Sequence, residues 1–381
     1  MLLSLERERE RERDMEDERN KPMPEEFPMN GGDGPYSYAK NSTYQRRITN
    51  ISKARIDDAI AKKLDIKSPS FTKSTALCIA DLGCSVGPNT FIAMQNIVEA
   101  IKLKYGSEGL SSQIPDFQVF FQDHVSNDFN TLFASLPPDR PYFATGVPGS
   151  FHGRLFPKAS LHLVHSSIAL HWLSMVPKEV LDKDSPAWNK GKIHYGSPKK
   201  EVVQAYSVQF AKDIDSFLLA RAEEIVPGGL MVLKIQGLPN GIPYSQTGSV
   251  VLMDLLGSSL MDMAKMGLVS EAKVDSFNIP LYNPHFLEME GLLTRNDYFS
   301  LEGMELVTLD LLTEDVEPSA EMTAMHVRAG AEGMIKEHFG IDIIDELFDR
   351  LTKKIAEDIL FMNEGYKNLL TQFFVILKRK E

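Results

Sequence analysis

The sequence predicts an α/β fold, in which one mainly parallel sheet carries helices on both faces and an α-helical cap lies beside it. The first observation is a short apolar run, 77–82, that leads through Gly83 into a helical pattern beginning at Asn89. This order is typical of a buried strand, a tight turn and a helix. The second is that apolar runs and helical patterns keep alternating to about residue 240, after which a Met-rich helical stretch precedes two late strands.

Composition sets the class of protein and excludes several partners. With 381 residues, of which 43% are hydrophobic and 25% charged, the chain can bury a large core. A net charge of −12 without a basic cluster argues against nucleic acid, whose binding depends on Lys and Arg. No stretch reaches the roughly 18 apolar residues of a membrane span, so we expect no membrane partner. Two cysteines, Cys78 and Cys84, cannot form a disulfide framework, and we expect a cytoplasmic protein.

The amino-terminal part predicts a tail and then a loop. Residues 6–19 are almost all Glu, Asp and Arg without an apolar face, so we expect residues 1–26 to be a disordered charged tail rather than a targeting peptide. Three glycines and a proline interrupt the polar stretch 29–41, and a helical pattern follows from Ser42. This loop is either a solvated connector or a lid over a ligand.

The turn after the first strand predicts a ligand site. Gly83 and Gly87 lack the Cβ that would block close contact, and the first turn of the next helix offers unpaired N–H groups. These groups lie at the carboxyl end of a strand, where open α/β sheets bind ligands. We therefore expect a ligand to approach the backbone here, with a purely structural glycine turn as the alternative.

Two acids indicate the kind of ligand. Asp81 and Asp123 end two apolar runs, so they should lie at the ends of adjacent strands, where a carboxylate can accept the hydroxyls of a ribose. A dinucleotide fold favours G-x-G-x-x-G with an acid about 20 residues later. This chain instead reads Asp-x-Gly-x-x-x-Gly, with its second acid farther away. A nucleoside without phosphates fits better, and S-adenosylmethionine is the commonest such cofactor.

The same turn also fits a different chemistry. Residues 83–87 match G-x-S-x-G, the nucleophile elbow of serine hydrolases, with Ser85 as the nucleophile. An elbow follows several earlier strands and an oxyanion loop, whereas residues 1–76 carry no convincing buried strand. His326 and His338 are histidines that could complete a catalytic triad, so a serine esterase is kept as an alternative.

The middle of the chain adds two pairs of candidate contacts. A third strand and a fourth, at 160–167, bracket a Gly/Pro loop in which Ser150 and Phe151 could touch an adenine ring. His171 and Trp172 follow the fourth strand. They lie either in an amphipathic helix with a buried ring or in the wall of a pocket.

The second half predicts the cap and the closing strands. A long amphipathic helix, 201–225, stops at Pro227, and a fifth strand follows at 230–235. Strands at 299–307 and 371–378 close the sheet. We therefore expect three units: the tail, 1–26; a domain built on the sheet, 27–240 and 299–381; and a helical substrate-binding cap, 241–298 with parts of 310–360.

A series of motifs runs in order from about residue 27 to the end of the sequence. They include Asn30-Gly-Gly, Ser37-Tyr-Ala, Ala80-Asp-Leu-Gly-Cys-Ser, Gly146-Val-Pro-Gly-Ser-Phe, Leu161-His-Leu-Val-His-Ser-Ser, His171-Trp-Leu-Ser and Phe277-Asn-Ile-Pro. Together these motifs resemble the SABATH family of plant methyltransferases. Within that family the chain is most similar to the members that methylate the carboxyl groups of loganate and farnesoate.

The resemblance implies a Rossmann-like S-adenosylmethionine methyltransferase sheet with an α-helical cap, usually in a homodimer. Gln45 and Trp172 match the pair that holds a substrate carboxylate, and His171 matches a position that is also His in loganate-like and purine N-methylating members. These three are the candidate catalytic residues. The positions that match the family's cofactor contacts are Tyr38, Asp81, Cys84, Asn89, Asp123, His124, Ser150 and Phe151.

Three substitutions set this chain apart from many relatives. Ile168 stands in place of a Tyr, Leu281 in place of a Gln, and Asn30 in place of the Lys of salicylate-type members. The first two changes remove a polar group and the third removes a charge, so Ile168 is a further candidate substrate-binding residue and the substrate need not be a small benzoate.

The resemblance also implies a Mg²⁺ position. Its residues are Asn189, Asp275, Asn278 and the carbonyl of Phe277, all of them hard oxygen donors of the kind that Mg²⁺ accepts. A loop anchored by hydrogen bonds is the alternative.

The implied function is the methyl esterification of a small-molecule plant carboxylic acid by S-adenosylmethionine, with a terpenoid or iridoid acid as the expected substrate. Besides the serine esterase, two alternatives stay open. One is N-methylation of a purine or another heterocyclic alkaloid, and the other is a non-catalytic small-molecule binder.

Overall fold

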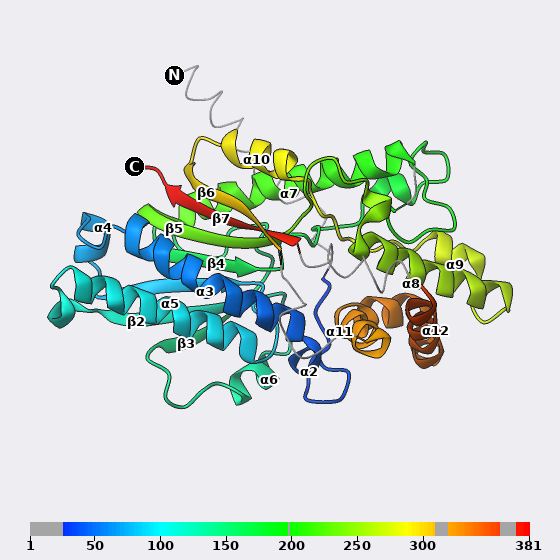
Figure 1. The fold of residues 1–381 in the computed structure, drawn as a ribbon, viewed down its shortest axis with the longest axis horizontal. Coiled ribbons are helices and arrows are strands. Elements are labelled where there is room, and N and C mark those ends of the chain that lie inside the picture. Colours follow the sequence, from blue (N-terminus) through cyan, green and yellow to red (C-terminus); the bar gives the residue numbers. More distant parts are fainter. Residues whose placement is uncertain (1–25, 197–198, 309–318, 359–370) are drawn as a thin grey trace, which may run out of the picture.

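Figure 1 shows the computed structural model, which describes residues 26–196, 199–308, 319–358 and 371–381 and confirms the predicted α/β fold. The sheet has seven strands in the order β3-β2-β1-β4-β5-β7-β6. Neighbouring strands are parallel from β3 to β5, whereas β7 is antiparallel to both of its neighbours. The strands are β1 (Ala76–Leu82), β2 (Asp116–Asp123), β3 (Phe143–Pro148), β4 (Leu161–Ser167), β5 (Ile225–Gln236), β6 (Phe299–Thr308) and β7 (Thr371–Arg379).

Helices cover both faces of the sheet (Figure 1). α3 (Thr43–Lys63) and α5 (Pro88–Ser107) pack on one face, and α7 (Lys200–Glu224) and α10 (Phe286–Thr294) pack on the other. β5 shows why both faces are apolar: Val232 packs with the α3 and α5 side, whereas Met231 and Leu233 pack with the α7 side. The shorter elements of this part are α2 (Tyr38–Asn41), α4 (Pro69–Thr72), α6 (Phe129–Ala134), η1 (Ser111–Gln113), η2 (Lys178–Val180) and η3 (Tyr244–Gln246).

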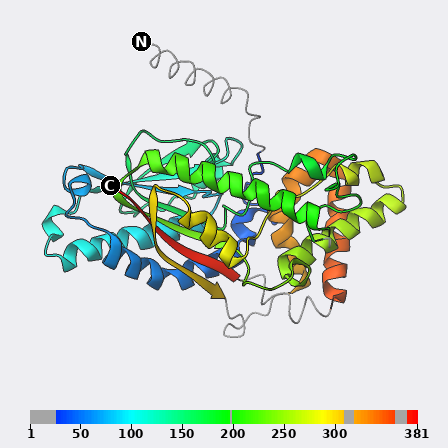
Figure 2. The same cartoon turned by 90° about the horizontal axis from the view of Figure 1, so that it is seen from above.

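A third apolar cluster lies at one end of the sheet, where four more helices gather (Figure 2). They are α8 (Gly248–Lys265), α9 (Glu271–Asp275), α11 (Ala320–Phe339) and α12 (Ile344–Glu357), with the short η5 (Ile341–Ile343). Buried residues of α12 recur every three or four positions and form one apolar stripe: Ile344, Leu347, Phe348, Leu351 and Ile355. We call this group the cap, and its separation from the sheet as a domain stays a prediction. α10 falls within the predicted cap range 241–298, but it buries its apolar side against the sheet cluster.

Residues 168–172, which follow β4, do not form the amphipathic helix that was one of the two structures predicted for them. Ile168 has a φ of +53°, and Trp172 forms an isolated antiparallel bridge with Leu281. The backbone N–H of Tyr282 donates to the carbonyl of His171 at 2.9 Å. Because these backbone groups pair with a distant loop, they cannot close the hydrogen bonds of a helix.

β5 also begins earlier than predicted. It starts at Ile225, directly after the last residue of α7, and runs through Pro227. Pro227 has no N–H to donate, and the register against β4 shifts between Leu161 and Leu163. The predicted stop is therefore an irregularity inside the strand rather than a loop before it.

The predicted tail and part of the predicted cap fall on residues that the structure does not describe. Of the predicted tail, 1–26, only Glu26 belongs to the described residues, and part of the range 310–360 also lies outside them. No helix in the described part of the chain is long and apolar enough to cross a membrane.

A buried ion pair fixes the loop that follows β3. Arg221 Nε lies 2.7 Å from Glu224 Oε2, and both side chains are fully buried. Arg221 also donates to the carbonyls of Phe151 at 3.1 Å and Gly153 at 2.8 Å, while Glu224 accepts from the N–H of Phe156 at 3.0 Å. Through these bonds the pair holds the loop against α7.

Replacing Arg221 with Met should lower the free energy of unfolding by about 3–5 kcal/mol, because it leaves Glu224 as an uncompensated buried charge. Urea denaturation followed by circular dichroism measures this loss. Arg154→Met is the control, since it breaks the neighbouring pair with Glu223, in which both side chains are about half exposed. Equal losses in the two variants would contradict a special role for the buried pair.

Candidate active site

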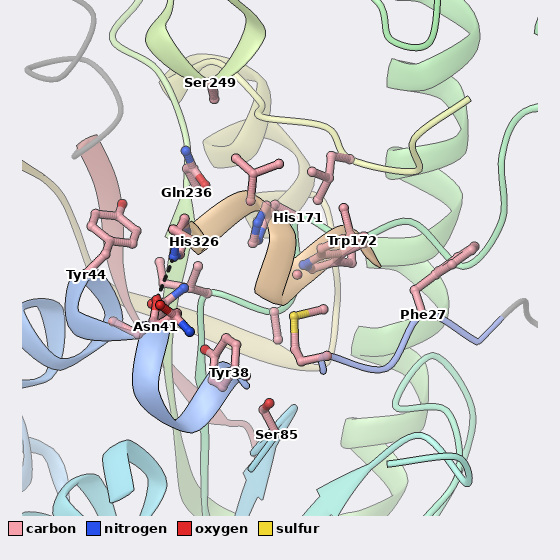
Figure 3. Close-up of a pocket in the computed structure, with 18 of the residues that line it drawn as sticks. Phe27, Tyr38, Asn41, Tyr44, Ser85, His171, Trp172, Gln236, Ser249 and His326 are labelled. Atoms are coloured by element: carbon pink, nitrogen blue, oxygen red, sulfur yellow. Dashed lines mark hydrogen bonds between the residues drawn. The ribbon is translucent and has the colours of Figure 1, made fainter. Parts of the chain in front are cut away.

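A cavity of about 380 Å³ lies at the carboxyl ends of the parallel strands, between α2, α3 and the cap (Figure 3). β1 and β4 are neighbours in the sheet, but the chain leaves them toward opposite edges. Such a switch in strand order is where open α/β sheets bind their ligands. The volume is in the usual range for small-molecule sites.

The turn after β1 brings the backbone to this cavity. Gly83 has a φ of +77°, and a Cβ there would stand 2.4 Å from the Cβ of Ala169. Gly87 has a φ of +117°, and its Cβ would lie 3.0 Å from the Cα of Ala39. Both positions therefore need glycine, for backbone conformation and for space.

Asp123 lies at the end of β2, next to β1, as the sequence predicted. Its Oδ2 accepts from the N–H of Ser85 at 2.7 Å, and its Oδ1 accepts from the N–H of His124 at 2.8 Å. Burial raises the pKa of Asp123, although these hydrogen bonds oppose the shift. Asp123 and His124 both line the cavity, where a carboxylate suits the hydroxyls of a ribose.

Asp81, at the end of β1, lies deeper. It accepts from Thr90 Oγ1 and, at 2.7 Å, from His165 Nδ1. Asp81 lines a second hollow of about 30 Å³, which shares Tyr38, Gln45 and Gly83 with the main cavity. Other predicted cofactor residues on this hollow are Cys84 and Asn89.

The predicted adenine contacts differ in their placement. Phe151 lines the main cavity, and its ring packs edge-on against Phe217 with centroids 6.1 Å apart. Ser150 is not among the described residues that line the cavity, and its Oγ accepts from the N–H of His152 at 3.3 Å. A flat apolar ring next to buried carboxylates fits the adenosine part of S-adenosylmethionine.

Gln45, His171 and Trp172 all line the cavity (Figure 3 shows the last two). The indole of Trp172 stacks with the ring of Phe27, with centroids 6.2 Å apart. Gln45 Oε1 and His171 Nδ1 are buried without a hydrogen-bond partner among the described residues. Burial, with a contribution from His326, lowers the pKa of His171 to about 3, so this ring is uncharged at neutral pH. Uncharged polar groups therefore await a ligand here.

Residues 26–36, which we call the strap, precede α2 in the chain and lie against the cavity. Phe27 and Met29 line the cavity. The N–H of Asn30 donates to the carbonyl of Ala329 on α11 at 2.9 Å, and the N–H of Gly32 donates to Asp128 Oδ2 at 2.8 Å. These contacts favour the lid over the solvated connector.

Several polar lining residues had no counterpart in the sequence analysis. His194, Gln236, Ser249 and Asn283 all face the cavity. Asn283 Nδ2 donates to Ser249 Oγ at 2.8 Å, while Asn283 Oδ1 and His194 Nδ1 are buried without a hydrogen-bond partner in the described part of the chain. His194 and Asn283 reach the site through the long-range contacts of the loop around residue 281, for which the sequence carries no local signal. Apolar residues share this lining: Ile168, Leu252, Met253, Ile279 and Leu281.

The serine esterase alternative is wrong. Ser85 has the positive φ of a nucleophile elbow, 53°, but its Oγ has no hydrogen-bond partner among the described residues. The two late histidines are engaged elsewhere. His326 Nδ1 is 3.1 Å from the carbonyl of Asn41, and His338 Nε2 is 2.8 Å from the carbonyl of Lys273. Without a base on the hydroxyl, Ser85 is not activated.

The predicted Mg²⁺ residues gather in one place. Asn189 Nδ2 donates to Asn278 Oδ1 at 2.7 Å, and the N–H of Gly191 donates to Asp275 Oδ1 at 2.8 Å. The donor types fit Mg²⁺, yet the unpartnered buried atom here, Asn278 Nδ2, is a hydrogen-bond donor and calls for no cation. No cluster of three or more His, Cys, Asp or Glu suited to a metal occurs among the described residues.

Comparison with known proteins agrees with this geometry. Loganic acid O-methyltransferase of Catharanthus roseus is 48% identical over 93% of this chain and 95% of its own length. Farnesoic acid carboxyl-O-methyltransferase of Arabidopsis thaliana is 41% identical over 94% of this chain and all of its own length. A solved structure of loganic acid methyltransferase with SAH superposes with a TM-score of 0.88, at 47% identity, over 93% of this chain and 99% of that one.

The family described as SAM dependent carboxyl methyltransferase matches residues 24–380. The fold, the cavity at the strand switch and these matches lead to one conclusion: the chain belongs to the S-adenosylmethionine-dependent carboxyl methyltransferases, the family that its motifs resemble.

Proposed function

We propose that this protein converts a terpenoid or iridoid carboxylic acid into its methyl ester, with S-adenosylmethionine as the methyl donor. The observation that carries the substrate class is the cavity, in which uncharged polar groups lie next to an apolar lining. The relatives named for loganic and farnesoic acid support the same class. The bound cofactor supplies an electrophilic methyl group on its sulfonium.

The chain's own contribution is to bind and orient the acid. Carboxylic acids have a pKa near 4 and are ionised at neutral pH, so the attacking oxygen needs no general base. The low pKa of His171 agrees with this, because an uncharged ring orients a substrate without protonating it. Gln45 and Trp172 would donate to the carboxylate, and holding an oxygen about 3 Å from the methyl group can be worth effective molarities of roughly 10⁵–10⁸ M. The strap residues Phe27 and Met29 would exclude water.

The Trp172 side chain gives the sharpest test of this arrangement. Trp172→Phe keeps an aromatic ring but removes the indole N–H, a hydrogen bond to a charged group of about 1.5–3 kcal/mol. Catalytic efficiency should fall roughly ten- to a hundred-fold, measured as methyl ester formed with labelled cofactor. Calorimetric affinity for S-adenosylhomocysteine should stay unchanged. Turnover equal to the wild type would show that the indole does not hold the acid.

The Ile168 position should govern the size of the accepted acid. Ile168 and the apolar residues near it leave room that a Tyr ring would fill, so the wild type should prefer a bulky terpenoid or iridoid acid over salicylate. Ile168→Tyr should shift the ratio of kcat/KM toward small flat acids by about ten-fold, on the order of the energy of one large side chain in a pocket. A competition assay with both acids measures this ratio. Wild-type preference for salicylate over every terpenoid acid would refute the proposed substrate class.

We also propose a cytoplasmic homodimer with Mg²⁺ at the Asn189 and Asn278 loops, on the strength of the family resemblance and the oxygen donors gathered there. Light scattering tests the dimer: a sample treated with EDTA and dialysed should still give twice the 42.7 kDa of one chain.

Thermal melting tests the metal: the EDTA-treated sample should melt a few degrees lower than after Mg²⁺ is restored. An unchanged melting temperature and unchanged turnover would assign these residues to a hydrogen-bonded anchor, and a single-chain mass would remove the dimer.

A further inference from the structure

A row of three ionisable side chains lies on one face of β1, β4 and β5, beneath the cofactor end of the cavity. Asp81 on β1 is the register partner of His165 on β4, and Ser167, two residues farther, is the partner of Lys234 on β5. Alternate residues of a strand share a face, so Lys234 stands on the same face as His165. All three side chains are buried, with residue exposures of 3%, 1% and 0% in the order of the row.

The hydrogen bonds along this row are incomplete. His165 Nδ1 lies 2.7 Å from Asp81 Oδ1, and burial lowers the pKa of His165, so the ring is uncharged and donates from Nδ1. Its Nε2 is then an acceptor, which has no partner among the described residues. Lys234 Nζ is a hydrogen-bond donor, and it too is buried without a partner among the described residues. The two are complementary. The adjoining hollow of about 30 Å³ is lined by His165 and Ser167 and has room for a water, whereas Lys234 is not part of its lining.

A lysine buried without a direct partner is costly, so its charge needs an explanation. Burial lowers the pKa of Lys234 to about 8, opposed by the attraction of Asp81, and the side chain is mainly charged at pH 7. The helices that cover this face line the adjoining hollow with the uncharged groups of Gln45, Thr49 and Thr90. Among ionisable groups, Asp81 is the one whose charge acts on Lys234, and the charge of Lys234 adds to the effect of burial in lowering the pKa of His165.

The charge of Lys234 matters because two carboxylates stand side by side at the cofactor end. Burial raises the pKa of Asp123 and the charge of Asp81 adds a smaller rise, whereas His124 lowers it. Burial, and after it the charges of Asp123 and Asp81, raise the pKa of both Tyr38 and Cys84, so these two groups stay uncharged.

We propose that Lys234 is a positioning residue for the cofactor: its buried ammonium, in the same row as His165, offsets the charge of Asp81 and so allows the neighbouring Asp123 to remain a carboxylate. This inference rests on the proposed use of S-adenosylmethionine and deepens it. It assigns a role to a residue that touches neither the cavity nor the reacting atoms. Removing the ammonium should leave Asp123 protonated at a higher pH and therefore unable to accept two ribose hydroxyls.

The test is the pH dependence of S-adenosylhomocysteine binding, measured by calorimetry between pH 5 and 8.5 on the full chain. Wild-type affinity should fall as the pH drops through the pKa of Asp123, because protonation removes an acceptor. In Lys234→Met the same fall should occur about one pH unit higher, so that affinity at the acid end of the range is up to roughly ten-fold weaker while affinity at pH 8.5 approaches that of the wild type.

Two further variants separate charge from structure. Lys234→Gln keeps a hydrogen-bond donor without the charge, and it should show the same shift; it also serves if Lys234→Met does not fold. Lys62→Met removes a lysine whose side chain is 68% exposed and should leave the profile unchanged. An equal loss of affinity at every pH, or an unshifted profile in both Lys234 variants, would overturn the inference. Absence of binding by the wild type would instead overturn the proposed function.

Discussion

The pairing of β1 with β2 on one side and β4 on the other is the interaction on which the site depends. It brings Asp81, Asp123 and the segment from Ile168 to Trp172 together at the carboxyl ends of these strands. Because alternate residues point to opposite faces, a slip of one residue in this register would turn Asp81 away from His165. Hydrogen bonds between buried backbones therefore fix the positions of cofactor and substrate groups that lie far apart in the sequence.

Burial then decides what these groups can do. His171 and His194 both have pKa values near 3 because they are desolvated, so the cavity offers them as uncharged hydrogen-bond groups. Such groups can hold an anion without exchanging a proton with it. A methyl transfer to a carboxylate asks for no more than this, since the nucleophile arrives already ionised. The chemistry of the site is thus one of orientation and exclusion of water.

The sequence was informative where the chemistry is local. The strand, the glycine turn and the acid at Asp81 could be predicted from about a dozen residues. The reason is that few residues other than glycine fit the backbone conformation and the space at positions 83 and 87. The motifs of the family extended this to most of the site. Long-range contacts carried no such signal: the bridge between Trp172 and Leu281 replaces a plausible helix, and it also brings Asn283 to the cavity. The same holds for Lys234, which reads as a polar interruption in a buried strand until its neighbours are known.

One feature of the cavity also shapes the kinetics. Some of the residues expected to hold the cofactor line the same cavity as those expected to hold the acid, and Phe27 and Met29 belong to its wall. The cofactor residues in question are Tyr38, Asp123, His124 and Phe151. A methyl group that moves directly between two ligands in one chamber never rests on the protein. Both reactants must then be bound at the same moment, as in a ternary complex, and initial-rate plots at fixed acid concentrations converge on a point instead of running parallel.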